Sequence, residues 1–369
     1  MIVLVHIFFA KKIYKYYQLI HSRDINQINK YVKSTTMKVV IPVAGAGTRL
    51  RPHTYTQPKP LMPVAGKPII CFIIDRLAEA GIKDFVFVIG YLGEKIRDFI
   101  NQAYPDLNTE FVYQEHREGS AHAILTAREA LKGEKEVLIA FGDTIFEADL
   151  RKMIDCKNSC IGTKKVSDPR EFGVAECDER GLVTRLVEKP RIPKSNSAIV
   201  GLYKINDAPG LLKAIDELIE QNIRTVGEYQ LTDALQRMVE KGAKIETLAV
   251  KNWFDCGRKE VLLETNAMLL SQPGYASDAF NLPEFENTIF IHPVAVGVNC
   301  QISNSIIGPH VSIGDNAAIH YAIVRDSIIG NFASIEDVVL KHSVLGSDAS
   351  IRGRNFSLNV GDNTEIDFE

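Results

Sequence analysis

Short apolar runs alternate with amphipathic segments through the first two thirds of the chain. The runs 39–43, 85–90 and 137–141 are almost continuously apolar, which is typical of strands buried on both faces of a parallel sheet. The intervening segments 69–80 and 94–104 carry apolar residues at helical spacing. This alternation predicts an α/β domain with a Rossmann-like, doubly wound sheet.

From residue 160 onward several strands are expected in succession before the next helices. The expected elements are strands at 160–166, 173–177, 182–188, 198–205 and 244–250, and helices at 208–221, 231–241 and 257–270. The segment Asp178-Glu179-Arg180-Gly181 has the composition of a hairpin turn, which joins antiparallel strands. We therefore expect the sheet of this domain to be mixed.

The C-terminal part of the chain repeats a five-residue motif. The motif begins at Asn304, Asp326 and His342, and within each run aliphatic residues recur every six positions, as at 307, 313 and 319. This hexapeptide rhythm resembles that of the left-handed parallel β-helix, in which one aliphatic side chain per strand points inward and the coils stack. Roughly four coils fit into the available length.

These patterns divide the chain into four parts. We expect an N-terminal extension over 1–36, the α/β domain over 37–271, a linker over 272–287 and the β-helix over 288–369. The extension lacks Gly and Pro and carries a net charge of +5, against −8 for the remainder. Because Met37 directly precedes the first strand, we expect it to be the natural start of the protein. A helix lying on a membrane surface is the alternative for this extension.

Charge and cysteine usage exclude several classes of protein. A formal net charge of −3 gives no electrostatic footprint for a nucleic-acid partner. The apolar run at 1–10 is too short to span a bilayer, and its lysines follow it rather than precede it as in a secretory signal. The six cysteines form no CxxC pair and have no zinc spacing. We expect reduced thiols, no membrane span and a cytoplasmic location.

The strand 39–43 leads into a loop, Ala44-Gly45-Ala46-Gly47-Thr48-Arg49, that has the character of a phosphate-binding turn. Its two glycines let the backbone turn sharply and present N–H groups to an anion. Lys59 follows in a segment stiffened by prolines. The loop is neither a dinucleotide fingerprint, because Leu50 occupies the third glycine position, nor a P-loop. We interpret it as a phosphate cradle with two adjacent cations.

The complete string from Lys38 to Pro68, GxGTRL followed by PKPLxPVxGKP, resembles the signature of the sugar-phosphate nucleotidyltransferases, which make nucleoside-diphosphate sugars. Further family motifs follow in order, namely Gly142-Asp143, Phe172-Gly173-Val174, Glu188-Lys189-Pro190, Val200-Gly201-Leu202-Tyr203 and Trp253-Phe254-Asp255-Cys256-Gly257. The resemblance covers 38–270. It is strongest to the long form of glucose-1-phosphate thymidylyltransferase, which carries an appended β-helix.

The resemblance implies a reaction in which an oxygen of a sugar 1-phosphate attacks the α-phosphorus of a nucleoside triphosphate and pyrophosphate leaves. Because the attacking oxygen is already anionic, positioning and charge neutralisation supply most of the catalysis. The implied catalytic residues are Arg49, Lys59 and Asp143, and the implied ligands of Mg²⁺, or of Mn²⁺ in its place, are Asp143 and Asp255. The implied nucleotide contacts are Ala44, Gly45, Ala46, Gly47, Thr48, Gln114, Gly119 and Ser120. The implied sugar-phosphate contacts are Gly173, Glu188, Lys189, Gly201 and Tyr203.

Gln114, at a strand end, is expected to read the base. Its amide offers one donor and one acceptor, which matches the imide edge of uracil or thymine. These bases differ by one methyl group, worth only about 0.8 kcal/mol of burial. We therefore expect dTTP or UTP as the nucleotide, with glucose 1-phosphate as the sugar.

Three other functions are compatible with the sequence. One is mannose-1-phosphate guanylyltransferase. Another is a bifunctional uridylyltransferase whose β-helix acetylates a sugar amine, with His310, His320 and His342 as candidate bases. The third is a non-catalytic regulatory relative, although such relatives tend to lose the metal carboxylates and the signature Arg and Lys. In each case we expect the β-helix to support a homo-oligomer.

Overall fold

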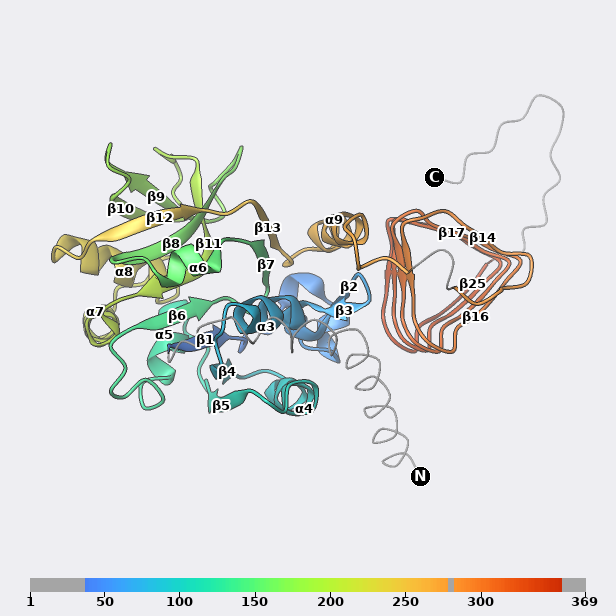
Figure 1. Ribbon diagram of the computed structural model, residues 1–369, viewed down its shortest axis with the longest axis horizontal. Helices are drawn as coiled ribbons and strands as arrows, with labels where there is room; N and C mark the ends of the chain where they lie inside the picture. The colour runs from blue at the N-terminus through green and yellow to red at the C-terminus, as the bar shows by residue number, and fades with distance from the viewer. Residues whose placement is uncertain (1–36, 278–281, 354–369) are drawn as a thin grey trace. The chain divides into compact units, whose positions relative to one another are not determined.

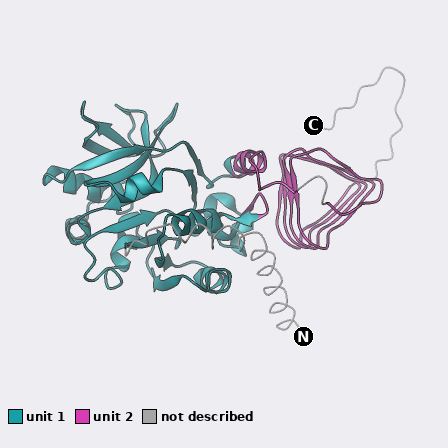
Figure 2. Ribbon diagram, in the orientation of Figure 1, with its two compact units in different colours: residues 1–62, 67–261 teal, residues 63–66, 262–369 magenta. Residues whose placement is uncertain are grey.

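The computed structural model describes residues 37–277 and 282–353, and Figure 1 shows their secondary structure. Contacts divide the chain into two compact units, coloured separately in Figure 2. The first comprises the chain up to Met62 together with Lys67–Val261, and the second comprises Pro63–Gly66 together with the chain from Leu262 onward. The predicted extension at 1–36 lies outside the described residues, as do 278–281 of the predicted linker and 354–369 of the predicted β-helix.

A nine-stranded mixed sheet forms the centre of the first unit. Its strands are β1 (Lys38–Pro42), β4 (Asp84–Ile89), β5 (Asn108–Tyr113), β6 (Val137–Ala140), β8 (Ser159–Lys165), β9 (Gly173–Cys177), β10 (Val183–Glu188), β11 (Ser197–Ile205) and β12 (Ile245–Ala249). The order is β10-β9-β11-β6-β1-β4-β5, with β8 pairing β11 and β12 pairing β8. The predicted Rossmann-like mixed sheet is confirmed.

The parallel part of the sheet consists of β6, β1, β4 and β5. Val39 of β1 lies in register with Phe85 of β4 and Leu138 of β6, and all three side chains are buried. Burial on both faces explains why β1, β4 and β6 are mostly apolar rather than alternating, whereas the edge strand β5 is partly exposed. Because the four strands run in one direction, their carboxyl ends share one edge of the sheet, where ligands bind in such folds.

The remaining strands join through β11, which is antiparallel to β6, β8 and β9. β10 is antiparallel to β9 across the predicted hairpin turn, and β12 returns parallel to β8. A separate two-stranded antiparallel sheet pairs β7 (Thr144–Glu147) with β13 (Asn252–Asp255), and Figure 1 shows the two strands side by side. The sequence patterns did not predict this pair.

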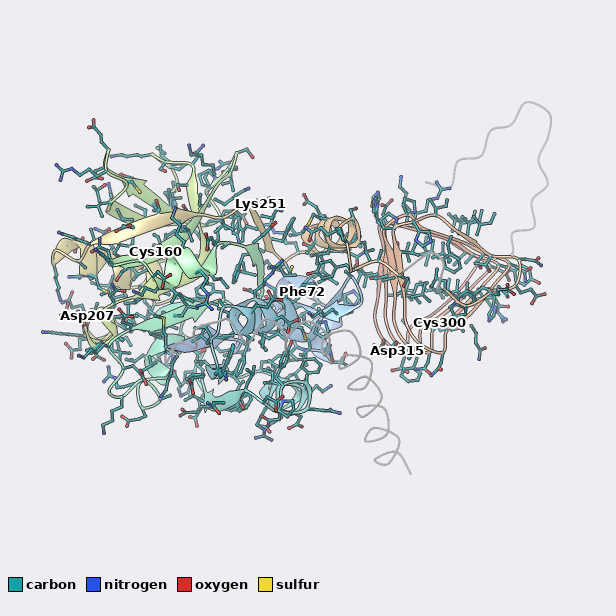
Figure 3. All side chains as sticks on the ribbon, viewed as in Figure 1. Phe72, Cys160, Asp207, Lys251, Cys300 and Asp315 are labelled. Carbon is teal, nitrogen blue, oxygen red and sulfur yellow. The ribbon has the colours of Figure 1, made fainter. Side chains whose placement is uncertain are left out.

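Each helix buries apolar side chains. The helices are α3 (Ile69–Glu79), α4 (Gly93–Ala103), α5 (Ser120–Thr126), α6 (Leu150–Ile154), α7 (Ala208–Glu220), α8 (Leu231–Glu240) and α9 (Lys259–Leu270), with short strands β2 (Pro63–Val64) and β3 (Lys67–Pro68) before α3. Asp207, labelled in Figure 3, caps α7, since its Oδ1 accepts a hydrogen bond from the Gly210 N–H at 2.9 Å. None of the helices in 37–277 and 282–353 is long and apolar enough to cross a membrane.

The described residues of the second unit include twelve short parallel strands in three sheets of four. They are β14 (Ile289–Phe290), β15 (Val294–Val296), β16 (Gln301–Ser303), β17 (Ile306–Ile307), β18 (Val311–Ile313), β19 (Ala318–His320), β20 (Ile323–Arg325), β21 (Ile328–Ile329), β22 (Ser334–Glu336), β23 (Val339–Lys341), β24 (Val344–Leu345) and β25 (Ser350–Arg352). Figure 1 shows the stacked coils. Ile307, Ile313 and Ile319 are buried inside, as the six-residue rhythm predicts. The predicted left-handed β-helix is confirmed.

Candidate active site

Within the part of the chain that the structure describes, the loop after β1 presents backbone N–H groups that have no protein acceptor. Among the described residues, no N–H from 45 to 49 donates a hydrogen bond. Gly47 has φ of 59°, and a Cβ at that position would lie 3.0 Å from side-chain atoms of both Thr54 and Lys59. Thr54 Oγ1 donates to the Gly47 carbonyl at 2.8 Å and holds the turn. The loop is therefore fixed in shape while its N–H groups remain available to an anion.

Two carboxylates that are distant in sequence meet beside this loop. Asp143 lies between the end of β6 and the start of β7. Asp255 is the last residue of β13, and the antiparallel pairing with β7 sets it opposite Thr144. The Cys256 N–H also donates to the Asp143 carbonyl at 3.2 Å. The β7–β13 pair thus brings together the two residues that the sequence nominates as metal ligands.

Lys59 lies between these carboxylates. It belongs to the 3₁₀ turn η3 (Lys59–Leu61), and only 8% of its side chain is exposed. Its Nζ is 2.5 Å from Asp143 Oδ2 and 3.5 Å from Asp255 Oδ1. Arg49, in the turn η1 (Thr48–Leu50), places a guanidinium nitrogen 3.9 Å from Asp255 Oδ2. Two cations and two carboxylates therefore form one compact charge cluster.

The cluster shifts the pKa values of its members. Burial alone would raise the pKa of Asp143, but the Lys59 charge and the hydrogen bonds from Lys59 and Thr144 outweigh it, and that pKa is lowered. Burial alone would lower the pKa of Lys59, but Asp143 and Asp255 outweigh it, and that pKa is raised. Both shifts favour the charged forms, so at neutral pH the lysine is cationic and Asp143 is anionic.

The donor set suits a hard divalent cation. Asp143 and Asp255 already share one cation, the Lys59 ammonium, so their oxygens are close enough to serve a common ion. Within the part of the chain that the structure describes, no group of three or more His, Cys, Asp or Glu side chains could hold a metal ion. An ion held by the two carboxylates would therefore need further ligands, and phosphate and water oxygens are the kind that Mg²⁺ prefers.

A cavity of about 380 Å³ opens over the loop and the charge cluster. The predicted site residues that line it are Ala44, Gly45, Gly47, Thr48, Arg49, Lys59, Gln114, Gly119, Ser120 and Asp143. Ala46 and Asp255 do not line it, although Asp255 contacts Lys59, which does. The other lining residues were not predicted as site residues, and they are Pro42, Val43, Pro60, Arg117, Ala123, Phe141, Gly142, Glu228 and Gly257. Of these, Gly257 belongs to the motif that nominated Asp255.

Gln114 directly follows β5, the strand of the parallel part of the sheet that is farthest from β6. Its N–H continues the parallel pairing by donating to the Ile89 carbonyl at 2.8 Å, and the residue is only 5% exposed. Gly119 follows at φ of 112°, where a Cβ would lie 2.4 Å from the Tyr229 carbonyl oxygen. The close approach of two backbones therefore requires glycine at this position.

The predicted sugar-phosphate residues form a separate group on β9, β10 and β11. Gly173 and Glu188 are paired across β9 and β10, and Thr232 Oγ1 donates to Glu188 Oε2 at 2.7 Å. Burial raises the pKa of Glu188, and burial together with the Glu188 charge raises that of Tyr203. Lys189 follows with φ of 42°.

This second group is adjacent to the cavity rather than among its lining residues. The connection is Phe141, which lines the cavity. Its ring centroid is 5.7 Å from that of Tyr203, and its N–H donates to the Gly201 carbonyl at 2.8 Å. A Cβ on Gly201 would lie 3.0 Å from the Phe141 ring. The two groups of predicted residues are thus linked by one aromatic side chain.

The fold and the charge cluster agree with a comparison to protein families. A family model described as nucleotidyl transferase matches residues 38–272, which is most of the chain. The chain belongs to the nucleotidyl transferase family. The predictions of the family and of its enzymatic class are therefore confirmed.

Individual relatives extend this picture. A glucose-1-phosphate thymidylyltransferase of Streptomyces antibioticus is 32% identical over 323 residues, which are 79% of this chain and 87% of that protein. The bifunctional protein GlmU of Methanocaldococcus jannaschii is 36% identical over 238 residues, which are 64% of this chain and 55% of that protein. A crystal structure of a UDP-glucose pyrophosphorylase complexed with UDP-glucose matches with a TM-score of 0.56 and 26% identity, covering 63% of this chain and 98% of that one.

Proposed function

We propose that this nucleotidyl transferase makes a nucleoside-diphosphate sugar and pyrophosphate from dTTP or UTP and glucose 1-phosphate. The observation that carries the proposal is the convergence of Lys59, Asp143 and Asp255 beside a loop whose N–H groups are free for phosphate. The choice of substrates is supported by the relatives, which include a thymidylyltransferase for glucose 1-phosphate and a UDP-glucose pyrophosphorylase.

In this reaction a phosphate oxygen of the sugar 1-phosphate forms a bond to the α-phosphorus, and the bond from that phosphorus to the pyrophosphate oxygen breaks. The nucleophile is anionic from the start, so no side chain has to remove a proton. The free N–H groups of the loop and Arg49 bind the triphosphate, and Lys59 offsets charge that builds up on the transferring phosphoryl group. Glu188 accepts hydrogen bonds from sugar hydroxyls, and Lys189 holds the sugar phosphate.

Asp143 and Asp255 would hold the divalent ion, for which we propose Mg²⁺ or Mn²⁺ because both ligands are oxygens. When bound, such an ion supplies charge neutralisation at the α-phosphate. Lys59 lies between the two carboxylates in this structure, so its ammonium would have to turn away from them for the pair to hold an ion. A homo-oligomer and a cytoplasmic location stay predictions.

A product survey tests the proposal. Each of the four common ribonucleotides and dTTP is incubated with glucose, galactose, mannose and N-acetylglucosamine 1-phosphates, and products are separated by anion-exchange chromatography. We expect pyrophosphate and a nucleotide-linked glucose from dTTP or UTP. A product from GTP and mannose 1-phosphate, or turnover of acetyl-CoA, would favour one of the alternative functions, and no product with any pair would refute the proposal.

The variant Asp143→Asn tests the metal-dependent mechanism, and Asp106→Asn, which changes an exposed aspartate, is its control. We expect Asp143→Asn to lower kcat by at least about a hundredfold, because charge stabilisation at the transferring phosphorus is lost. Much of the nucleotide affinity should remain, since the loop N–H groups and Arg49 are unchanged. Excess EDTA on the wild type should reproduce the loss. Near-normal turnover of Asp143→Asn, or turnover that persists in EDTA, would contradict the metal-dependent mechanism.

A further inference from the structure

The amide of Gln114 is held by two contacts on the same nitrogen. Its Nε2 is 3.4 Å from the Gly119 carbonyl oxygen and 2.9 Å from Nδ1 of His122 on α5. A carbonyl oxygen only accepts hydrogen bonds, so the amide atom that faces Gly119 must be the NH₂ group. The Gln114 side chain therefore has one orientation, and both of its N–H donors are used within the protein.

This orientation also defines the role of His122. Because Nδ1 faces an NH₂ group, it must accept, and the ring proton of the neutral imidazole must reside on Nε2. His122 Nε2 lies 3.8 Å from the Glu118 carboxylate, which favours a proton at that nitrogen. The three side chains thus form a chain in which the charge of Glu118 fixes the tautomer of His122, and His122 in turn fixes the amide of Gln114.

Glu118 is itself well anchored. Arg224 Nη2 donates to its Oε1 at 2.8 Å, and the Arg224 guanidinium stacks on the Tyr229 ring at 4.0 Å. The hydrogen bond from Arg224 lowers the pKa of Glu118, so the carboxylate is ionised at neutral pH. The Tyr229 N–H also donates to the Glu118 carbonyl at 2.8 Å. The loop that carries Glu118 is thereby fastened to 224–229 through both backbone and side chains.

The opposite atom of the amide, Gln114 Oε1, remains available to a ligand. No residue that the structure describes donates a hydrogen bond to it, and it is not among the fully buried polar atoms that lack a partner. Since Gln114 lines the cavity, its free acceptor is the atom that meets a base there. The sequence reading gave this amide one donor and one acceptor for the base, whereas the contacts in the structure leave only the acceptor.

We propose that Glu118 and His122 are positioning residues that hold Gln114 with its acceptor toward the base, so that the site selects bases carrying a ring N–H and rejects cytosine. This inference rests on the proposed function and deepens it. Uracil and thymine present N3–H to an acceptor, whereas N3 of cytosine is itself an acceptor. Two acceptors that face each other lose the hydrogen bond and repel, which penalises cytosine.

The test compares UTP and CTP, which share ribose and triphosphate and differ at the base edge. Dissociation constants are measured by isothermal titration calorimetry without sugar phosphate, alongside kcat/KM for both nucleotides. In the wild type we expect UTP to be preferred by at least about a hundredfold. In His122→Ala the amide loses its 2.9 Å contact and keeps only the longer 3.4 Å contact with the Gly119 carbonyl. The amide can then rotate more readily, and the preference should fall by about tenfold or more, mainly through KM.

Two further variants make the test specific. In His122→Asn the Asn Oδ1 can take the place of Nδ1 as acceptor, so most of the preference should return. His116→Ala removes an exposed histidine from the same loop and should leave the preference unchanged. Far-UV circular dichroism and Tm identify any variant that fails to fold. If His122→Ala does not fold, the nucleotide preference of His122→Asn decides the outcome.

The inference is overturned by a folded His122→Ala enzyme that keeps the wild-type preference, by failure of His122→Asn to restore it, or by a wild type that does not distinguish UTP from CTP. Its failure is separable from that of the proposed function. Discriminating binding without any product would refute the proposed function alone, and product formation with a preference that survives His122→Ala would refute the inference alone.

Discussion

Replacing Lys59 by methionine tests whether its ammonium balances the two carboxylates of the active site. Methionine is unbranched and of similar length, so the variant Lys59→Met removes the charge while keeping most of the packing. Asp143 and Asp255 then lose their shared counter-ion, 2.5 Å and 3.5 Å away in the wild type. We expect the variant to be less stable without metal and to recover part of that stability when Mn²⁺ is added.

The size of the effect follows from burial. Breaking a fully buried ion pair costs about 3–5 kcal/mol, whereas exposed pairs contribute about 0–1 kcal/mol. Lys59 is 8% exposed, but the Asp143 and Asp255 side chains are 38% and 28% exposed, so solvent screens part of the interaction. We therefore expect a loss of about 2 kcal/mol. For a unit of this size that corresponds to about 4–8 °C in Tm.

The pH dependence has a defined sign. The raised pKa of Lys59 gives stability that is present below the ordinary lysine value of 10.5 and is lost as pH rises through the folded-state value. The lowered pKa of Asp143 gives stability that is present above the ordinary value of 3.8 and is lost as pH falls through the folded-state value. The difference in the free energy of unfolding between wild type and Lys59→Met should therefore be largest near pH 7.5 and decrease in acid.

Trp253 provides the assay, because it is the only tryptophan of the chain and lies on β13, two residues before Asp255. Its fluorescence during urea unfolding in EDTA reports on the first unit, whatever the β-helix does. The control is Lys251→Met, which removes a lysine that is 77% exposed and pairs with Glu147 at 3.1 Å (Figure 3). The control should change stability by less than about 0.5 kcal/mol. Equal stability of Lys59→Met and wild type in EDTA, or a difference that persists unchanged at pH 3, would refute the reasoning.

Two further substitutions probe the opposite ends of the site. Gly119→Ala forces a Cβ to within 2.4 Å of the Tyr229 carbonyl oxygen, so we expect the nucleotide KM to rise at least about tenfold in steady-state assays. The control is Gly133→Ala. Gly133 also has a positive φ, but a Cβ there would meet nothing within 4 Å, so KM should be unchanged. Glu188→Gln removes a half-buried carboxylate whose pKa is raised, so the variant should match or exceed wild-type Tm at pH 7.5. This advantage fades as pH falls through the raised folded-state pKa and is gone below the ordinary glutamate value of 4.5. The same variant should raise KM for glucose 1-phosphate, and an unchanged KM would remove Glu188 from the sugar site.

The strands of the first unit were predictable where burial leaves a clear pattern. β6 is apolar throughout, and β1 and β4 are apolar after their first residues Lys38 and Asp84, because both faces are covered. The predicted boundaries differ from the observed ones by about one residue. The β-helix was predictable for a related reason. Every coil must supply an inward aliphatic residue at a fixed interval, so stacking imposes a period that the sequence displays directly.

The β7–β13 pair was not predictable, although it joins the two metal-ligand candidates. Each strand has only four residues, and Asn252–Asp255 is half-buried without a regular alternation of apolar and polar positions. Nothing local indicates that these segments, separated by about a hundred residues, are partners. Motif order nominated Asp143 and Asp255 individually, and their roles stay predictions that the variants above test.

The contacts of His122 and Lys59 also escaped the sequence analysis, for a different reason. Both depend on which atoms of neighbouring elements face each other, and residue type does not determine that. Gln114 and His122 are eight residues apart, at a strand end and on a helix, and the loop between them carries Glu118, which pairs with Arg224. Sequence reasoning could assign Gln114 a donor and an acceptor, but only the folded loop decides which of them remains for a ligand.

Gly142 explains why the charge cluster forms where the sheet changes from parallel to antiparallel. β6 is the last parallel strand before β11, and directly after it the chain turns away to form β7. A Cβ on Gly142 would lie 2.2 Å from Val43 Cγ1 and 3.2 Å from the Pro42 carbonyl oxygen, so the turn passes in direct contact with the end of β1. That approach sets Asp143 beside the phosphate-binding loop, because a larger residue at 142 would push the two strand ends apart. The glycine of the Gly142-Asp143 motif is thus required by packing, and its small size lets the Asp143 carboxylate reach Lys59.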